Sequence, residues 1–238
     1  MAVTTEQGHP ASNGKAVAQP PGGVQGWALR NVVERALHIQ HPLVTGHIAN
    51  IRRKQPNATP AEVITALGKQ YQVAVTVTGG AGGALAIVPA LGTIASLATA
   101  SAEALAALDA AVLYTLAVAE VHALPTDDPE RRRALVLGVV VGETGQAVVR
   151  KMTGKTGDWA QLVTDSLPLA KLGPLNSGLT RWFIKRFLVR QGSLALGRAL
   201  PLGIGLVIGA VGNLVTAKAV IRSAEHAFGA PPAQWPSA

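Results

Sequence analysis

The chain has 238 residues, of which 48% are hydrophobic and 14% are charged, and its net charge is +8. It has no Cys, which excludes a disulfide scaffold, a Cys zinc site and a Cys nucleophile. A typical soluble domain has about 25% charged residues, so the low charge indicates either that much of the surface lies against lipid or a partner, or that the chain tends to self-associate.

Both ends of the chain have the composition of disordered segments. Residues 1–26 are rich in Gln, Gly, Pro and Ser and lack the apolar segment of a signal peptide. Residues 229–238, GAPPAQWPSA, look similar. We therefore predict disordered tails at 1–26 and 229–238, around one helical domain at 27–228.

The first clear helix start is at Thr59. Thr59 is a good cap, Pro60 suits the first helical position, and Glu62 completes a capping box. Residues 72–77, QVAVTV, alternate like a strand, but the residues before them have helical spacing. We favour a helix that runs from about Pro60 up to the glycines that follow.

The glycine-rich stretch at 76–89, TVTGGAGGALAIVP, has the look of a phosphate-binding loop. A dinucleotide loop read from Gly80 requires a small residue where Leu85 stands, and the reading from Gly79 places Ala81 at the second Gly. The sequence therefore predicts no nucleotide site here. We expect Gly79, Gly80, Gly82 and Gly83 to allow close helix packing or a turn.

The remaining segments also read as helices. Ala and Leu dominate residues 89–124, which predicts one long helix or two in a hairpin. Asp128 and Pro129 start another helix, expected at about 129–152 and ending near Gly154. The sequence MTGKTGD at 152–158 resembles the end of a P-loop but has Val149 in place of the first Gly, so Gly154 is interpreted as a helix stop.

Three further helices complete the map. Asp158 with Gln161 predicts a short helix, and Asn176 is expected to cap a helix through Arg190. The last helix should begin after Pro201 and end before Gly229. No stretch alternates for long enough to build a sheet, so the chain is predicted to be all-α, a Gly/Ala-rich helical bundle with long apolar helices.

Small residues spaced four apart occur in two apolar helices. The pairs are Gly138 with Gly142 and Gly205 with Gly209. Such G-x-x-x-G spacing lets two helix backbones approach closely, within one chain or between copies. It indicates tight helix pairing and leaves a homo-oligomer open as an alternative.

No catalytic or metal site can be assigned from motifs. Asp109 and Glu120 share a helical face but lie about 16 Å apart along the axis, too far for a catalytic carboxylate pair. There is no G-x-S-x-G, no H-E-x-x-H and no acidic metal cluster. We assign no cofactor; the alternative is an enzyme acting on lipid-like substrates through Glu103, Asp109 or Asn213, which requires two of these to share one pocket.

Charge is distributed unevenly along the chain. Residues 70–130 contain no Lys or Arg, whereas cations precede this block at 52–54 and follow it from 131 to 198. Each Lys or Arg near an anionic membrane is worth roughly 1 kcal/mol. Without a nucleic-acid-binding motif, this pattern favours anionic lipid over nucleic acid as the partner.

Two uncharged runs raise the question of membrane insertion. They are residues 70–102 and 199–217. In the second run, nine Leu, Ile or Val residues contribute about −0.3 to −0.6 kcal/mol each, and Pro201, Asn213 and the glycines offset them. We favour shallow, peripheral or re-entrant association, with both cationic flanks on the cytoplasmic side.

Residues 179–190, LTRWFIKRFLVR, are typical of an interfacial anchor. An apolar face of Phe183, Ile184, Phe187 and Leu188 would enter the headgroup region beside cations. The alternative is an ordinary core helix whose Lys and Arg reach to solvent. The candidate lipid-contact residues are Arg181, Trp182, Phe183, Lys185, Arg186, Phe187 and Arg190.

Two blocks resemble the EcsC family. The first runs from the glycine-rich stretch through residues 84–124 to DDPERRRALVLGVVVG, and the second is ALPLGIGLVIGAVGNLVTAKAVIRSAEHAF. The matching positions are Gly79, Gly80, Gly82, Gly83, Pro129, Arg131, Pro201, Gly205, Gly209 and Asn213. The resemblance implies a mostly helical, membrane-associated bacterial protein linked to transport or secretion, and it implies no activity.

Together these observations predict a non-catalytic protein on the cytoplasmic face of a bacterial membrane. Its basic section would dock on anionic lipid while the Gly-rich apolar helices pack or insert shallowly. A membrane-protein partner or a second copy of the chain would also fit these helices.

Overall fold

The computed structural model of the chain describes residues 41–85, 93–154, 158–198 and 204–235. Within these ranges it describes only the backbone at 41, 78–85, 93–105, 187–198 and 204–211. The predicted tail at 1–26 and the start of the predicted domain, 27–40, lie outside the described residues. All the regular elements described are helices, which confirms the all-α prediction.

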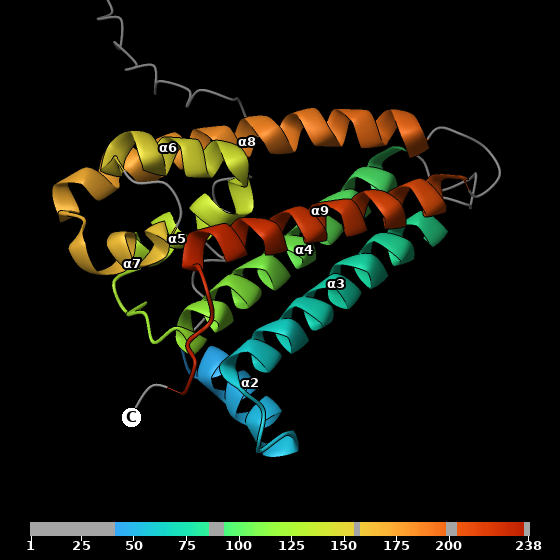
Figure 1. Cartoon of the computed structure of the whole chain (residues 1–238). Coiled ribbons are helices and arrows are strands. Elements are labelled where there is room, and N and C mark those ends of the chain that lie inside the picture. Colours follow the sequence, from blue (N-terminus) through green and yellow to red (C-terminus); the bar gives the residue numbers. More distant parts are fainter. Residues whose placement is uncertain (1–40, 86–92, 155–157, 199–203, 236–238) are drawn as a thin grey trace, which may run out of the picture.

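The described helices form two groups, one built on long helices and the other on a single long helix with several shorter helices (Figure 1). The first group is α2 (His41–Lys54), α3 (Pro60–Leu85), α4 (Thr93–Val121) and α9 (Ile204–Phe228). The second group is α5 (Pro129–Val141), α6 (Glu143–Thr153), α7 (Trp159–Gln161), the π-helix η1 (Leu162–Ser166) and α8 (Leu169–Arg198). α3 packs along α4 and α9, and α5 packs against α6 and α8 while also contacting α4 and α9.

The start of α3 is the predicted capping box. The Glu62 carboxylate accepts hydrogen bonds from the Thr59 backbone N–H at 2.8 Å and the Thr59 hydroxyl at 2.9 Å. The Thr59 hydroxyl oxygen in turn accepts from the Glu62 N–H at 3.3 Å. These bonds lower the pKa of Glu62 from its ordinary value. The predicted helix start is therefore confirmed.

α3 does not end at the glycines but runs through Gly79, Gly80, Gly82 and Gly83 to Leu85. The prediction of an end at the glycines is therefore wrong, whereas helix at 72–77 is confirmed. A buried stripe at 63, 67, 71 and 75 has the four-residue spacing of a helix face. This stripe belongs to the common core, so packing along α4 and α9 outweighs the local strand-like alternation.

α5 is the central helix of the fold. Asp128 caps it by accepting a hydrogen bond from the Arg131 N–H at 2.8 Å, and Pro129 begins it, as predicted. Residues 134–139 and Val141 are all buried. A helix that is apolar on every side must be surrounded by protein, and α4, α6, α8 and α9 supply the neighbours.

Loss of the α5 cap should be measurable. We expect Asp128→Ala to lower the free energy of unfolding by about 1 kcal/mol, because the Arg131 N–H loses its partner. Asp127→Ala is the matched control, since it removes the adjacent exposed carboxylate, which makes no cap. Chemical denaturation of both variants makes the comparison, and equal losses would contradict the capping role.

The single helix predicted at about 129–152 is wrong, because the chain breaks at Gly142. Gly142 has φ +74° and ψ −141°, between α5 and α6. The break folds α6 back so that Gly145 packs on the backbone carbonyl of Gly138, where even a Cβ would overlap. The Trp159 ring also packs on Gly138. A Cβ on Gly138 would lie 2.5 Å from the Trp159 Cη2 atom. Gly138 and Gly142 therefore serve packing and turning within one chain.

Other predicted helix ends had mixed outcomes. Gly154 stops α6 in the left-handed conformation, with φ +74° and its N–H bonded to the Arg150 carbonyl, as predicted. α7 follows Asp158 as expected and continues into η1. Asn176 does not cap a helix, because α8 begins at Leu169 and Asn176 lies inside it. The last helix, α9, agrees with the prediction.

Residues 229–235 pack onto the domain, so the predicted disordered tail at 229–238 is wrong over these residues. The Trp235 indole N–H donates to the Ala58 carbonyl at 3.0 Å. The Arg52 guanidinium lies 4.2 Å from the centre of the same ring. A single aromatic residue therefore ties this segment to the α2–α3 connection, while 236–238 lie outside the described residues.

Candidate membrane interface

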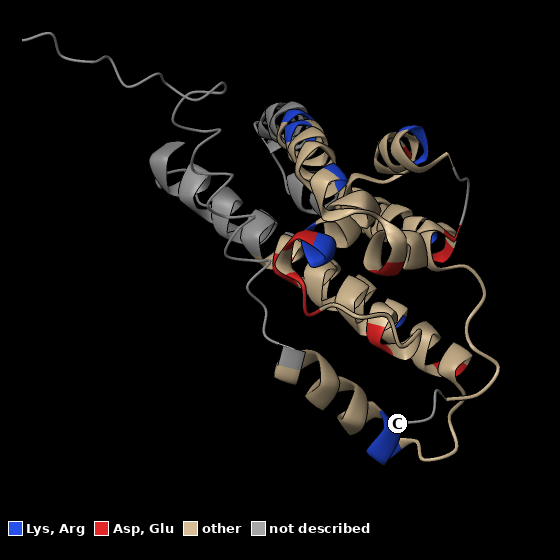
Figure 2. Cartoon of the chain, turned by 90° about the vertical axis from the view of Figure 1, so that its left-hand side faces the viewer, with Lys and Arg blue, Asp and Glu red and all other residues tan. Residues whose placement is uncertain are grey.

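The longest described helix, α8, has charges of one sign only. Its 30 residues include six Lys or Arg and no Asp or Glu. The neighbouring helix α6 adds Arg150 and Lys151 and carries one acid, Glu143. α6 and α8 lie side by side (Figure 1), and cations occur on both in the turned view (Figure 2). We call the exposed cations of α6 and α8, together with Trp182, the basic face.

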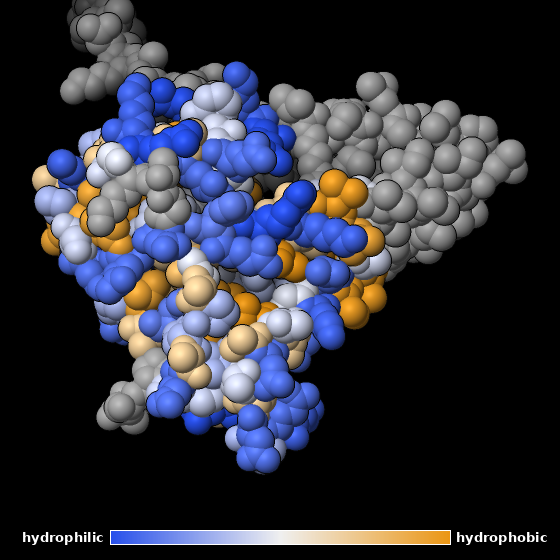
Figure 3. All heavy atoms as spheres, in the orientation of Figure 1, coloured by the Kyte–Doolittle hydropathy of each residue, from blue (hydrophilic) through white to orange (hydrophobic). Residues whose placement is uncertain are grey.

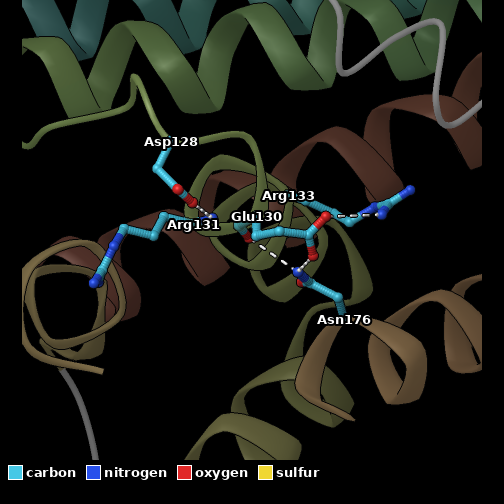
Figure 4. Close-up of polar contacts among 5 residues, drawn as sticks. All are labelled: Asp128, Glu130, Arg131, Arg133 and Asn176. Atoms are coloured by element: carbon cyan, nitrogen blue, oxygen red, sulfur yellow. Dashed lines mark hydrogen bonds and ion pairs between the residues drawn. The ribbon is translucent and has the colours of Figure 1, made fainter. Parts of the chain in front are cut away.

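Side-chain hydrogen bonds join α8 to the start of α5 (Figure 4). The Asn176 side-chain amide donates to the Glu130 carbonyl at 3.0 Å and to the Glu130 carboxylate at 2.7 Å. The same carboxylate lies 3.4 Å from Arg133. On the other side of α5, Arg131 donates to the Val163 carbonyl of η1 at 2.8 Å. These bonds fix which side of α8 faces the protein.

The inner side of α8 is an ordinary core face over its described half. Leu172, Leu175 and Leu179 are fully buried, and Phe183 and Ile184 are each 8% exposed. The interpretation of Phe183 as a lipid contact is therefore wrong, because the protein core already covers it. The side chains of Phe187 and Arg190, also predicted contacts, lie outside the described residues.

The remaining predicted contacts do lie on the surface. Arg181, Lys185 and Arg186 are exposed, and Trp182 is 43% exposed. The Lys185 ammonium lies 5.2 Å from the centre of the Trp182 ring. Arg186 also donates to the Val141 carbonyl at 3.3 Å, at the end of α5. An exposed Trp among cations is the arrangement expected of an interfacial anchor.

One end of the molecule lies near one end of α8, and we call it the apolar end because the sequence stretches that meet there, within 70–102 and 199–217, carry no charge. At this end of the molecule α3 ends and α4 begins, and likewise α8 ends and α9 begins (Figure 1). On the sides of α3 and α9, Val73, Val77 and Val215 are 62%, 63% and 59% exposed. Hydrophobic surface occurs over this part of the long helices (Figure 3). Among the described helices, none combines the length and apolarity required to span a bilayer.

The other predicted packing glycines can be placed only by their backbone. Gly79, Gly80, Gly82 and Gly83 lie in α3, and Gly205 and Gly209 lie in α9. α3 and α9 make the most extensive helix pair of the fold. What surrounds these glycines lies outside the described part of the chain, so their role in packing stays a prediction.

The structure describes the side chains of two of the three predicted polar candidates. Asp109 is exposed on α4, whereas the Asn213 amide of α9 donates to the Val75 carbonyl of α3 at 3.2 Å. Asn213 therefore links two helices. The side chain of Glu103 lies outside the described residues.

The described residues also form a polar hollow that contains neither Asp109 nor Asn213. Its volume is about 350 Å³, and it lies at the ends of α4 and α9 and the start of α7. The lining residues are His122, Leu124, Asp158, Gln161, Phe228 and Ala230. No group of three potential metal ligands occurs among the described residues. Sequence reasoning missed this hollow, because Asp158 and Phe228 are far from His122 in the chain and belong to no motif.

His122 makes stability depend on pH. Burial lowers the pKa of His122 from its ordinary 6.5, although the negative charge of Asp158 opposes the shift. The unfolded state therefore binds the proton first as the pH falls. We expect the free energy of unfolding to decrease between about pH 7 and pH 5.5, and less so in His122→Asn. Denaturation at several pH values measures this, and an unchanged slope in the variant would assign the effect to other groups.

Comparison of the chain with protein-family models, with curated proteins and with solved structures gives no significant match.

Proposed function

We propose that this protein is a non-catalytic peripheral protein of the bacterial cytoplasmic membrane that docks on anionic lipid through the basic face. The observation that carries the proposal is the exposed Trp182 flanked by Arg181 and Lys185, on a helix without a single acid. The positive charges of this helix suit the anionic headgroups of a bilayer, and a partly exposed Trp ring suits the boundary between headgroups and acyl chains.

Magnitudes support docking that is reversible. At roughly 1 kcal/mol for each cation near an anionic surface, Lys151, Arg181 and Lys185 contribute about 3 kcal/mol together. Trp182 and cations further along α8 add to this. The sum is in the range of a weak to moderate peripheral association and falls as salt screens the charges.

The apolar end of the long helices offers a second contact. Val73 and Val77 lie one helical turn apart on α3 and are both exposed, in a stretch of the sequence without charge from 70 to 102. The apolar end would insert shallowly into the bilayer while the Lys and Arg side chains of the basic face contact lipid headgroups. Together the two contacts would give a re-entrant or peripheral attachment. A role in transport or secretion, as implied by the resemblance to the EcsC family, belongs to the same proposal.

Vesicle sedimentation tests the proposal. The purified full chain is mixed with vesicles of phosphatidylglycerol and phosphatidylcholine, and with vesicles of phosphatidylcholine alone. We expect binding to the anionic vesicles at low salt, little binding to the neutral ones, and release as the ionic strength passes about 0.5 M, where the Debye length is only a few Å. Equal binding to both vesicles, or none to either, would refute the proposal.

A further inference from the structure

The polar hollow has the features of a binding site that the membrane proposal does not use. It lies at the end of α9 opposite the apolar end (Figure 1). Three separate stretches of the chain build it, one just after the end of α4, one at the start of α7 and one at the end of α9. A ligand in solution would therefore reach it while the apolar end is held by lipid.

Among the described residues that line the hollow, Asp158 is the single Asp or Glu and there is no Lys or Arg, so the charge of this described lining is negative. The Asp158 carboxylate accepts no hydrogen bond from the described residues, although its backbone N–H donates to the His226 carbonyl at 3.0 Å. Because no described residue donates a hydrogen bond to this carboxylate, it can accept one from a donor group of a ligand.

The ends of two long helices add to this negative potential. α4 ends at Val121 and α9 ends at Phe228, each at the hollow. A helix C-terminus carries about half a negative charge. The start of α7 lies at the same hollow and has a positive end, but it is followed by only a short helical segment. With the Asp158 carboxylate, the two helix C-termini favour a cation as the ligand.

The backbone around the hollow is held in demanding conformations. Both non-glycine residues with positive φ among those described are here: Ala123, at +54° between two lining residues, and Asp158, at +43°. Gly229, at φ +73°, lies so close to the Asp158 carboxylate that any Cβ would overlap it. Such conformations persist where surrounding packing fixes them and are common at binding sites.

We propose that this hollow binds a small organic cation with a primary ammonium group, which pairs with the Asp158 carboxylate. The Gln161 side-chain oxygen accepts a second N–H of the ammonium, and the imidazole of His122 accepts another when it is neutral. The Phe228 ring, whose centre lies 5.3 Å from that of His122, packs on the alkyl part of the ligand with Leu124. The volume of about 350 Å³ suits a molecule of several heavy atoms.

Titration followed by amide NMR tests this site, with n-propylammonium chloride as the probe and n-propanol as its neutral counterpart. We expect saturable shifts at Asp158, Gly229 and Ala230 with the ammonium and none with n-propanol or sodium chloride. Asp158→Asn should weaken binding about tenfold or more, the equivalent of one charge-assisted hydrogen bond. The control Asp165→Asn, an exposed carboxylate outside the hollow, should bind like the wild type.

Three outcomes would overturn the site. They are no saturable shift up to about 50 mM, where even millimolar binding saturates, equal affinity in Asp158→Asn, or equal shifts with n-propanol. Gln161→Ala gives a second variant at an exposed position, and we expect a weaker loss from it. Anionic-vesicle binding of Asp158→Asn should stay at the wild-type level, which keeps this result separate from membrane docking.

Discussion

Replacing Trp159 by Ala is expected to lower the free energy of unfolding by about 3–5 kcal/mol, the range for a large aromatic side chain removed from a core. Trp159 is among the largest fully buried side chains of the protein and covers Gly138 at the centre of α5. Its indole N–H has no partner among the described residues, so the loss is one of packing. Denaturation followed by circular dichroism measures it.

Two comparisons make this prediction specific. Trp182→Ala removes the same side chain from the surface and should cost less than about 1 kcal/mol. Gly138→Ala alone should cost about 1–3 kcal/mol, because its Cβ would overlap the Trp159 ring. In the Trp159→Ala background that cost should fall to near zero. Additive losses in the double variant would contradict the contact.

The second large effect is expected in vesicle binding. Changing Lys151, Arg181 and Lys185 together to Gln should weaken binding to anionic vesicles roughly a hundredfold, from about 3 kcal/mol of lost attraction. All three side chains are exposed, and none makes a hydrogen bond that the fold needs. Arg186 stays unchanged in this variant because its side chain donates a hydrogen bond to the Val141 carbonyl.

The matched control removes equal charge from another surface. Arg53, Lys54 and Lys69 are exposed on α2 and α3, and α2 lies on the side of the molecule away from α8 (Figure 1). Changing these three to Gln should leave vesicle binding within about threefold of the wild type, since charges beyond a Debye length are screened. If the control loses as much as the α8 variant, net charge governs binding and the basic face does not.

The sequence predicted helix ends best where all the residues that form the end lie within a few positions of one another. The capping box at Thr59 and Glu62 and the cap at Asp128 each join residues three apart. The stop at Gly154 likewise depends on one turn of helix. Local propensity and capping chemistry determine such features, so they could be predicted without knowledge of the tertiary structure.

The candidate membrane interface was predictable only in part. The concentration of cations at 181–186 is a property of the sequence, but the sequence did not say which side of that helix faces the protein. The Asn176 and Glu130 contacts, 46 residues apart, set that rotation. Phe183 then turns to the core and Trp182 to the surface, opposite outcomes for adjacent aromatic residues that were both predicted to contact lipid.

By itself the sequence determined the all-α class, the capped helix starts at Thr59 and Asp128 and the uneven charge, because these depend on local propensity, capping and composition. Only the tertiary structure decided the break at Gly142, the course of α3 through its glycines, the docking of Trp235 and the hollow at Asp158. Each of these depends on residues distant in the chain, such as Trp159 on Gly138 or Asp158 on Gly229. Close packing selects one arrangement among several that the local pattern allows.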